Sequence, residues 1–238
     1  MSFSGKVREE LSENISQARH CRIAELAAFI GMCGTVSIDS FDRYHIKIHS
    51  ENIVVARKVF TLLKKTFNIR IDVSIRQSIG NHKNRTCTVA VTHHEDAMRV
   101  LQAVKLIDPY GEIEENLSLA QNVVLMQNCC KRAFIRGAFL AAGSISDPEK
   151  FYHFEIACAS KEKAEQLREL FEFFGLEAKI VLRKKYYVVY LKEGAMISDA
   201  LNIIEAHISL MKFENVRILK DVRNSVNRRV NCEAANIN

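Results

Sequence analysis

Residues 26–34, LAAFIGMCG, and residues 135–143, IRGAFLAAG, are two versions of one sequence element, placed 109 positions apart. Both segments are rich in small residues, and both end at a glycine. Each is followed by a short strand signal, at residues 35–38 and 144–146. An internal repeat constrains the fold of a chain more than any single motif does. We therefore expect two copies of one structural unit.

Hydrophobic periodicity predicts the same order of elements around each copy: helix, two strands, helix, two strands, helix. The expected helices begin near residues 20, 53 and 95 in the first half, and near residues 127, 161 and 198 in the second. The last of these is expected to run from residue 198 to 208. The expected strands cover residues 35–38, 44–49, 69–76 and 85–91, then 144–146, 152–156, 179–183 and 186–191. Strands grouped in antiparallel pairs predict an α+β fold.

A turn signal at Asp108-Pro109 divides the chain. We expect a first repeat with an N-terminal helix over residues 1–107, a linker over 108–120 and a second repeat over 121–209. Residues 210–238 are expected to form a basic helix. Gly34 is expected to close the first repeat helix as a normal C′ residue.

The small residues of the two repeat helices recur at helical spacing. They are Ala24, Ala27, Ala28 and Gly31 in the first copy, and Gly137, Ala138, Ala141 and Ala142 in the second. Small side chains on one face allow two helices to approach closely. The two helices can therefore pack on each other at the centre, or each can be buried in its own lobe.

The composition is that of a globular protein, with 48% hydrophobic residues and no apolar run of membrane-spanning length. The N-terminus lacks the apolar segment of a signal peptide, so we expect a cytoplasmic protein. The seven cysteines are an odd number, and several lie in apolar segments, which favours buried free thiols. Cys129 and Cys130 are adjacent, with no second pair at zinc-site spacing. No metal or cofactor is expected.

The two repeated segments resemble the LAGLIDADG motif of homing endonucleases. The first keeps Leu26, Ala27, Ile30 and Gly34, and the second keeps Gly137, Ala141 and Gly143. The αββαββα order of each half is also that of the homing-endonuclease fold. The resemblance implies two pseudo-symmetric LAGLIDADG-type repeats that pack through a central helix pair.

A resemblance to the WhiA family of bacterial transcription regulators covers nearly the whole chain. It is carried by residues 134–145, FIRGAFLAAGSI, with Asp147-Pro148, and by residues 227–233, NRRVNCE, with Ala235-Asn236. This family is similar to a two-repeat homing endonuclease followed by a helix-turn-helix domain. The resemblance implies that residues 227–238 lead into such a domain. It also implies a transcription regulator in sporulation and cell-division control.

The resemblance also bears on catalysis. In active homing endonucleases, the residue before the final glycine of each copy is an acid, and the two acids hold a divalent metal. This chain has Cys33 and Ala142 at those positions, and neither offers the oxygen ligand that a hard cation needs. We expect no nuclease activity and no metal. Without two like charges, the central helix pair is expected to be more apolar and more stable.

Double-stranded DNA is the expected partner, since the net charge is +6 and cations gather on the expected sheet faces and on the tail helix. The candidate DNA contacts are Arg43, Lys47, Arg70, Arg76, Lys83, Arg85, Lys179, Arg183 and Lys185 near the strands, and Arg217, Lys220, Arg223, Arg228 and Arg229 on the tail. Alternatively, the sheet cations form an ordinary solvated face, because Asp72 lies among them. The alternative function is a protein-interaction scaffold that binds a sigma factor or another transcription component.

Overall fold

The computed structural model describes residues 2–77, 85–107 and 124–236, with side chains up to residue 232 at the C-terminal end. The first half contains α1 (Phe3–Glu13), α2 (Arg19–Cys33), β1 (Gly34–Ile38), β2 (Tyr44–Ser50), α3 (Ile53–Phe67), β3 (Asp72–Gln77), β4 (Arg85–Val91) and α4 (His94–Ala103). The second half contains α5 (Asn128–Ala142), β5 (Gly143–Ile145), β6 (Phe154–Cys158), α6 (Lys161–Phe173), β7 (Lys179–Arg183), β8 (Tyr186–Leu191), α7 (Gly194–Ile203) and α8 (His207–Asn236). The expected linker, residues 108–120, lies outside the described residues.

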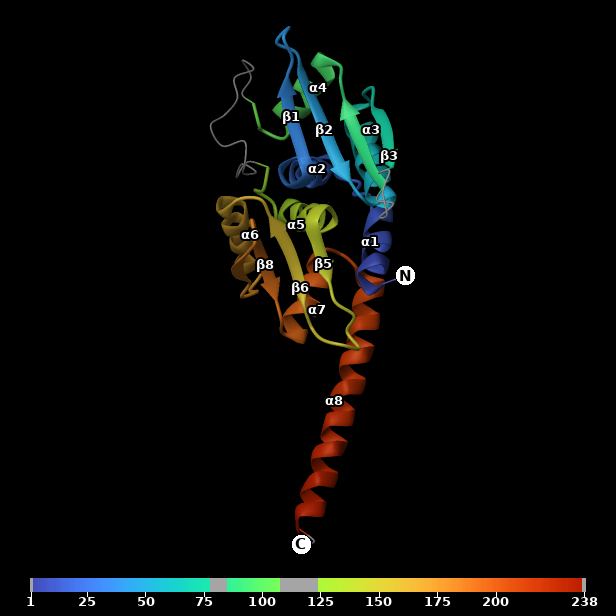
Figure 1. The fold of residues 1–238 in the computed structure, drawn as a ribbon, viewed down its shortest axis with the longest axis vertical. Helices are drawn as coiled ribbons and strands as arrows, with labels where there is room; N and C mark the ends of the chain where they lie inside the picture. Colours follow the sequence, from blue (N-terminus) through green and yellow to red (C-terminus); the bar gives the residue numbers. More distant parts are fainter. Residues whose placement is uncertain (1, 78–84, 108–123, 237–238) are drawn as a thin grey trace.

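Each half forms a four-stranded antiparallel sheet, and the two sheets have the same strand order, β1-β2-β4-β3 and β5-β6-β8-β7. Figure 1 shows the sheets as two lobes with α2 and α5 between them, and α8 projecting from the second lobe. The predicted α+β fold with two repeats is confirmed. No helix among the described residues is long and apolar enough to cross a membrane.

Local sequence explains where the outer helices begin. The Asn52 side chain accepts a hydrogen bond from the Val54 amide and caps α3, and the Ser160 hydroxyl accepts one from the Lys163 amide and caps α6. Such caps satisfy amides that have no partner within the first turn. The sheets pack on these helices through alternate residues, of which Ile46 and Ile48 of β2 are buried.

Some element boundaries differ from the expectation. The helix expected at residues 198–208 is instead α7, which begins at Gly194, followed by α8 from His207. Glu205 has φ 66° at the break between them, so the chain reverses through a left-handed residue there. The strand expected from residue 69 begins at Asp72, because ladder pairing with β4 starts at Asp72 opposite Ala90.

The expectation that Gly34 is an ordinary C′ residue was wrong. Gly34 has φ −92° and ψ 158°, so the chain passes from α2 directly into β1 in an extended conformation. A Cβ on Gly34 would lie 2.5 Å from the Ile30 carbonyl oxygen, and one on Gly143 would lie 2.6 Å from the Phe139 carbonyl oxygen. Glycine ends each repeat helix because there is no room for a side chain at these turns.

The two repeat helices do pack on each other, as the first of the two alternatives predicted. A Cβ on Gly137 of α5 would lie 2.7 Å from the Glu25 carbonyl oxygen and 2.9 Å from the Ala28 Cβ, both in α2. Gly31 plays no such part, since a Cβ there would meet no atom within 4 Å. The helix pair is therefore closest around Gly137 and Ala28.

The expectation of a more apolar helix interface was wrong. Glu25 of α2 and Arg136 of α5 are fully buried between the helices, and Lys58 of α3 is buried beside them. The Lys58 ammonium lies 2.5 Å from the Glu25 carboxylate and donates to the Leu11 carbonyl at 2.6 Å. Charges are tolerated in this interior because each one is paired and hydrogen-bonded.

Candidate nucleic-acid interface

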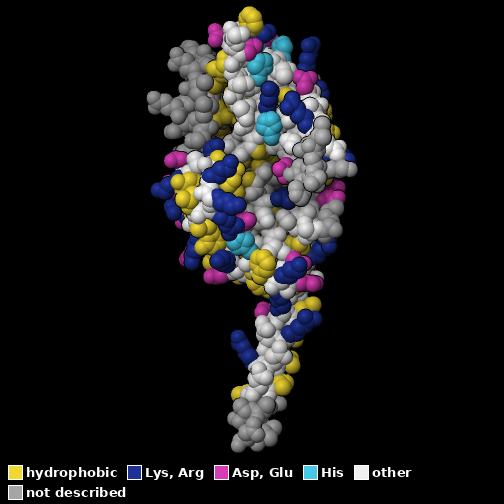
Figure 2. Space-filling view, viewed as in Figure 1, with side chains coloured by type: hydrophobic (Ala, Val, Ile, Leu, Met, Phe, Trp, Pro, Cys, Tyr) yellow, Lys and Arg dark blue, Asp and Glu magenta, His cyan; other side chains and the backbone are white. Residues whose placement is uncertain are grey.

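Each sheet has one face covered by helices and one free face, and the candidate DNA contacts were expected on the free faces. Helices α3 and α4 pack on the first sheet, and α6 packs on the second. Along β2, Ile46 and Ile48 point to the helices while Lys47 and His49 are exposed on the free face. Figure 2 shows Lys, Arg and His side chains on the surface, with Asp and Glu among them.

The free face of the first sheet presents two of the predicted cations, which could meet phosphates. Lys47 and Arg76 are exposed there and make no ion pair within the described part of the chain. Arg85 is also exposed, but it shares the strand parity of buried Cys87 and Val89 and so lies on the helix-covered side of β4. Lys47 lies opposite Thr35 of β1, and Arg76 lies opposite Thr86 of β4, so hydroxyl groups neighbour the charges. Arg70 is also exposed but precedes β3, and Lys83 lies outside the described residues.

Arg43 is less available than the sequence suggested. Its guanidinium lies 3.0 Å from the Asp39 carboxylate, which also lies 3.2 Å from His45 Nε2. Desolvation would raise the pKa of Asp39, but hydrogen bonds from the backbone N–H groups of Arg43 and Phe41 and from the His45 and Arg43 side chains hold that pKa well below its ordinary value. Asp39 is therefore ionised at neutral pH and lies next to the Arg43 guanidinium.

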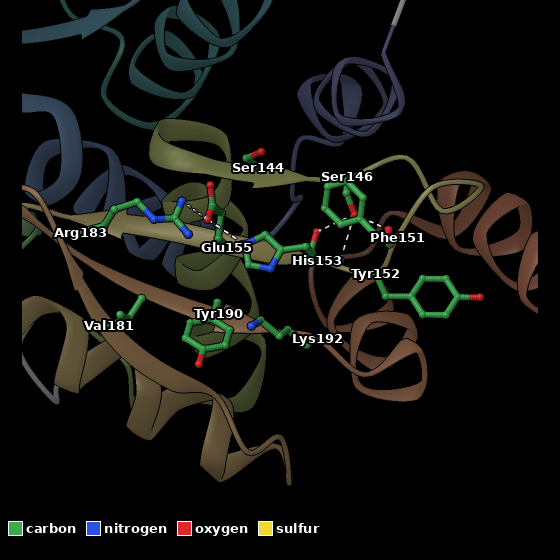
Figure 3. Close-up of a pocket in the computed structure, with 10 residues that line it drawn as sticks. All are labelled: Ser144, Ser146, Phe151, Tyr152, His153, Glu155, Val181, Arg183, Tyr190 and Lys192. Carbon is green, nitrogen blue, oxygen red and sulfur yellow. Dashed lines mark hydrogen bonds and ion pairs between the residues drawn. The ribbon is translucent and has the colours of Figure 1, made fainter.

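The second sheet carries a carboxylate at the centre of its free face. A groove of about 780 Å³ there contains Glu155, which lies 3.2 Å from Arg183 and 2.8 Å from His153. Figure 3 shows Glu155 between these two side chains. Lys179 is exposed, and the Lys185 ammonium lies 5.5 Å from the centre of the Tyr186 ring. This face is less basic than the sequence predicted, because Glu155 neutralises Arg183.

The tail helix α8 is held to the body at its N-terminal end. The Glu10 carboxylate accepts hydrogen bonds from the Ile208 and Ser209 amides, at 2.7 and 2.9 Å, so α1 caps α8. Phe213 is buried, with its ring centre 6.3 Å from that of Phe3 and 5.4 Å from that of Tyr152. Beyond this anchor the helix projects from the second lobe, as Figure 1 shows.

The five predicted cations of α8 divide into two groups. Arg217 lies 2.8 Å from the Glu214 carboxylate, and the Lys220 ammonium lies 4.8 Å from the centre of the Tyr152 ring, so both contact the body or a neighbouring acid. Arg223, Arg228 and Arg229 are exposed and have no ion pair among the described residues. The projecting part of α8 therefore carries three accessible guanidinium groups.

The positions of the lost acids lie beside a cavity of about 630 Å³ between the two halves, lined by Cys33, Ala141, His49 and Arg8 among others. The Cys33 thiol donates to the Phe29 carbonyl, and burial raises its pKa to about 12, so it is neutral at pH 7. The Arg8 guanidinium donates to the Gly143 carbonyl oxygen, next to Ala142. A cation, Arg8, thus lines the cavity beside the former acid positions, and Glu51 is the carboxylate among the described lining residues.

Sequence reasoning missed Arg8 and Glu155. Arg8 belongs to the helix assigned to the first repeat, yet it contacts the second repeat across 135 residues. No local pattern links positions so far apart. Glu155 could have been found, because it shares the strand parity of the predicted free face.

Comparison with known proteins identifies the family. A model of the "WhiA N-terminal LAGLIDADG-like domain" matches residues 19–107, and one of the "WhiA LAGLIDADG-like domain" matches residues 131–223. The probable cell division protein WhiA of Lachnoclostridium phytofermentans is 52% identical over 238 residues, which are 100% of this chain and 76% of that protein. The chain belongs to the WhiA family. The probable cell division protein WhiA of Alkaliphilus oremlandii is 47% identical over 239 residues, 74% of its length.

Solved structures with this fold include full-length WhiA from Thermotoga maritima, with a TM-score of 0.73 and 24% identity over 99% of this chain and 73% of that one. The homing endonuclease I-DmoI, crystallised with DNA and Mn, matches with a TM-score of 0.54 and 14% identity over 79% of this chain and 98% of that one. At these identities, the two structures establish that the WhiA-family chain has the LAGLIDADG fold.

Proposed function

We propose that this WhiA-family chain is a DNA-binding transcription regulator in cell-division and sporulation control, and that its LAGLIDADG-like repeats bind DNA without cutting it. Such a protein acts at the nucleoid, in the cytoplasm. The proposal follows from two properties of the molecule, a basic projecting helix and a cavity without paired acids. A protein that shares this fold, I-DmoI, was crystallised with DNA.

The observation that carries the proposal is that Arg223, Arg228 and Arg229 are exposed and unpaired among the described residues. All three are exposed on the part of α8 that projects from the body, and none is neutralised by a described carboxylate. Guanidinium groups on a protruding helix can reach the phosphates of a duplex with little steric hindrance. Residues 227–238 also resemble the segment that leads into the WhiA helix-turn-helix domain, which would place these cations beside DNA.

The cations of the first sheet would add contacts to the same duplex. Lys47 and Arg76 lie opposite threonines, whose hydroxyls can also hydrogen-bond phosphates. The second sheet would contribute less, because Glu155 lies in its groove. We therefore expect asymmetric contacts with the duplex, most of them made by α8 and the first sheet.

Fluorescence anisotropy with a labelled duplex tests the proposal. The wild-type chain should bind weakly and without strong sequence preference, and the affinity should fall steeply as salt rises. The triple variant Arg223→Gln, Arg228→Gln, Arg229→Gln should reduce the slope of log K against log salt by about 2–3, since each lost phosphate contact removes about 0.9.

A charge-matched control is available on the helix-covered side. Arg57→Gln, Lys65→Gln and Lys161→Gln remove three exposed cations from α3 and α6. This control should keep the wild-type salt slope. An equal reduction of the salt slope in both triple variants would show that net charge alone governs binding. That result would overturn the assignment of the contacts to α8.

A second candidate function is the protein-interaction scaffold that binds a sigma factor or another transcription component. It is favoured by an apolar stripe on α8, formed by Ile218, Leu219, Val222, Val226 and Val230, all more than half exposed. An apolar interface is much less sensitive to salt than phosphate contacts are. A chain that binds no duplex at low salt would leave this function as the better account.

A further inference from the structure

The N-terminal ends of α2 and α5 bring four metal-ligating side chains together. His20 and Cys21 are the second and third residues of α2, and Cys129 and Cys130 are the second and third residues of α5. The helices are repeat copies 109 positions apart, so His20 is equivalent to Cys129 and Cys21 to Cys130. The cluster therefore consists of two equivalent pairs, one from each half of the molecule.

The ligand atoms of the four side chains converge on one point. His20 Nδ1 lies 3.2 Å from Cys130 Sγ, 3.3 Å from Cys21 Sγ and 3.9 Å from Cys129 Sγ. All four ligand atoms lie within 4.8 Å of one another. In a tetrahedral zinc site, Zn–S bonds of about 2.3 Å and Zn–N bonds of about 2.0–2.1 Å separate the ligands by about 3.5–3.8 Å. The observed separations need only small side-chain rotations to match that geometry.

We propose that His20, Cys21, Cys129 and Cys130 bind one zinc ion as a Cys3His structural site that joins the two repeats. Soft thiolates and an imidazole select zinc over the hard cations magnesium and calcium, which take oxygen ligands. Four protein ligands leave no open position, which is the property of a structural rather than a catalytic zinc site.

Charge and burial fit a bound cation. Three thiolates and one zinc ion have a net charge of −1, and two helix N-termini favour a negative group. Cys21 and Cys130 are buried, whereas His20 and Cys129 are exposed and leave the ion a path from solvent.

No metal was expected here, because the sequence has no two cysteine pairs at the short spacing of a zinc site. The four ligands instead come from two adjacent pairs about 110 positions apart, which only the packing of α2 on α5 brings together. A zinc ion at this point would fix the ends of the two central helices, at the opposite end from Cys33 and Ala142.

Metal analysis of the untagged chain, purified under reducing conditions, tests the proposal. We expect one zinc per chain in the wild type. The exposed ligand variant Cys129→Ser should lose zinc to a chelator more than about tenfold faster than the wild type. The control Cys232→Ser, at an exposed cysteine on α8, should behave as the wild type.

Cobalt substitution gives a second readout that does not depend on how the protein was loaded. Co²⁺ added to the reduced, metal-free chain should give the thiolate charge-transfer band and the intense visible bands of a tetrahedral site, and Cys129→Ser should weaken both. Two results would overturn the proposal: zinc retention equal in the wild type and Cys129→Ser, or a reduced wild-type chain that gives no tetrahedral cobalt spectrum.

Discussion

The Arg136 guanidinium donates two hydrogen bonds of 3.1 Å, one to each carboxylate oxygen of Glu25, across the interface between α2 and α5. Both side chains are buried. Arg136 also lies 2.5 Å from Glu205, so the pair belongs to a network that connects the central helices with the turn before α8. The halves are thus joined by oriented charges as well as by close packing.

Removing one member of this network should be costly. Arg136→Met leaves Glu25 buried without its bidentate partner, and we expect a loss of about 3–5 kcal/mol in the free energy of unfolding. Arg168→Met, which breaks the exposed pair with Glu172 on α6, should cost less than about 1 kcal/mol. Urea denaturation measures both, and equal losses would show that the Arg136 pair contributes no more than a surface pair.

Two glycines in the repeat helices should respond to alanine in opposite ways. Gly137→Ala should destabilise the chain by about 1–3 kcal/mol, because its Cβ would lie 2.7 Å from the Glu25 carbonyl oxygen. Gly137→Leu should be more severe still. Gly31→Ala should stabilise by about 0.5–1 kcal/mol, since there is open space and alanine favours a helix. Thermal unfolding of the two alanine variants is the measurement, and the same sign of change in both would be inconsistent with the described packing.

The partly buried Cys33 thiol predicts a stability change at alkaline pH. Its pKa in the folded chain is raised from 9.0 to about 12. The contribution of the thiol to the free energy of unfolding is therefore fully present below pH 9 and is lost as the pH rises from 9 towards 12. The free energy of unfolding of the wild type should fall between about pH 8 and pH 10, and Cys33→Ala should make that fall smaller by about 1 kcal/mol. Denaturant melts at the two pH values measure this, with exposed Cys232→Ala as the control that should not change the decline.

Restoring the two acids should not restore an endonuclease. The double variant Cys33→Asp, Ala142→Asp places like charges at the ends of the two central helices, so it should be less stable than the wild type without a divalent cation. Added magnesium or manganese should recover part of that loss, while cleavage stays absent because Arg8 occupies the adjacent carbonyl. Thermal shifts with and without the cation test this, and a double variant as stable as the wild type in chelator would count against it.

The repeat, the antiparallel strand pairs and most helix boundaries could be predicted from the sequence, because they depend on local periodicity and capping residues such as Asn52 and Ser160. The buried network could not, since Glu25 and Arg136 are ordinary surface residue types in a sequence and only their pairing allows burial. The ion pairs that neutralise Arg43 and Arg183 could not be predicted, because Asp39 reaches Arg43 through a turn and Glu155 reaches Arg183 across the sheet, over β8.

The most direct test of DNA binding without cleavage is electrophoresis of supercoiled plasmid incubated with the purified chain and magnesium or manganese, loaded both with and without removal of the protein. We predict retarded migration while the protein is bound, and fully supercoiled plasmid after it is removed. Nicked or linear DNA that follows the protein peak through purification, or no retardation at any protein concentration in low salt, would contradict the account.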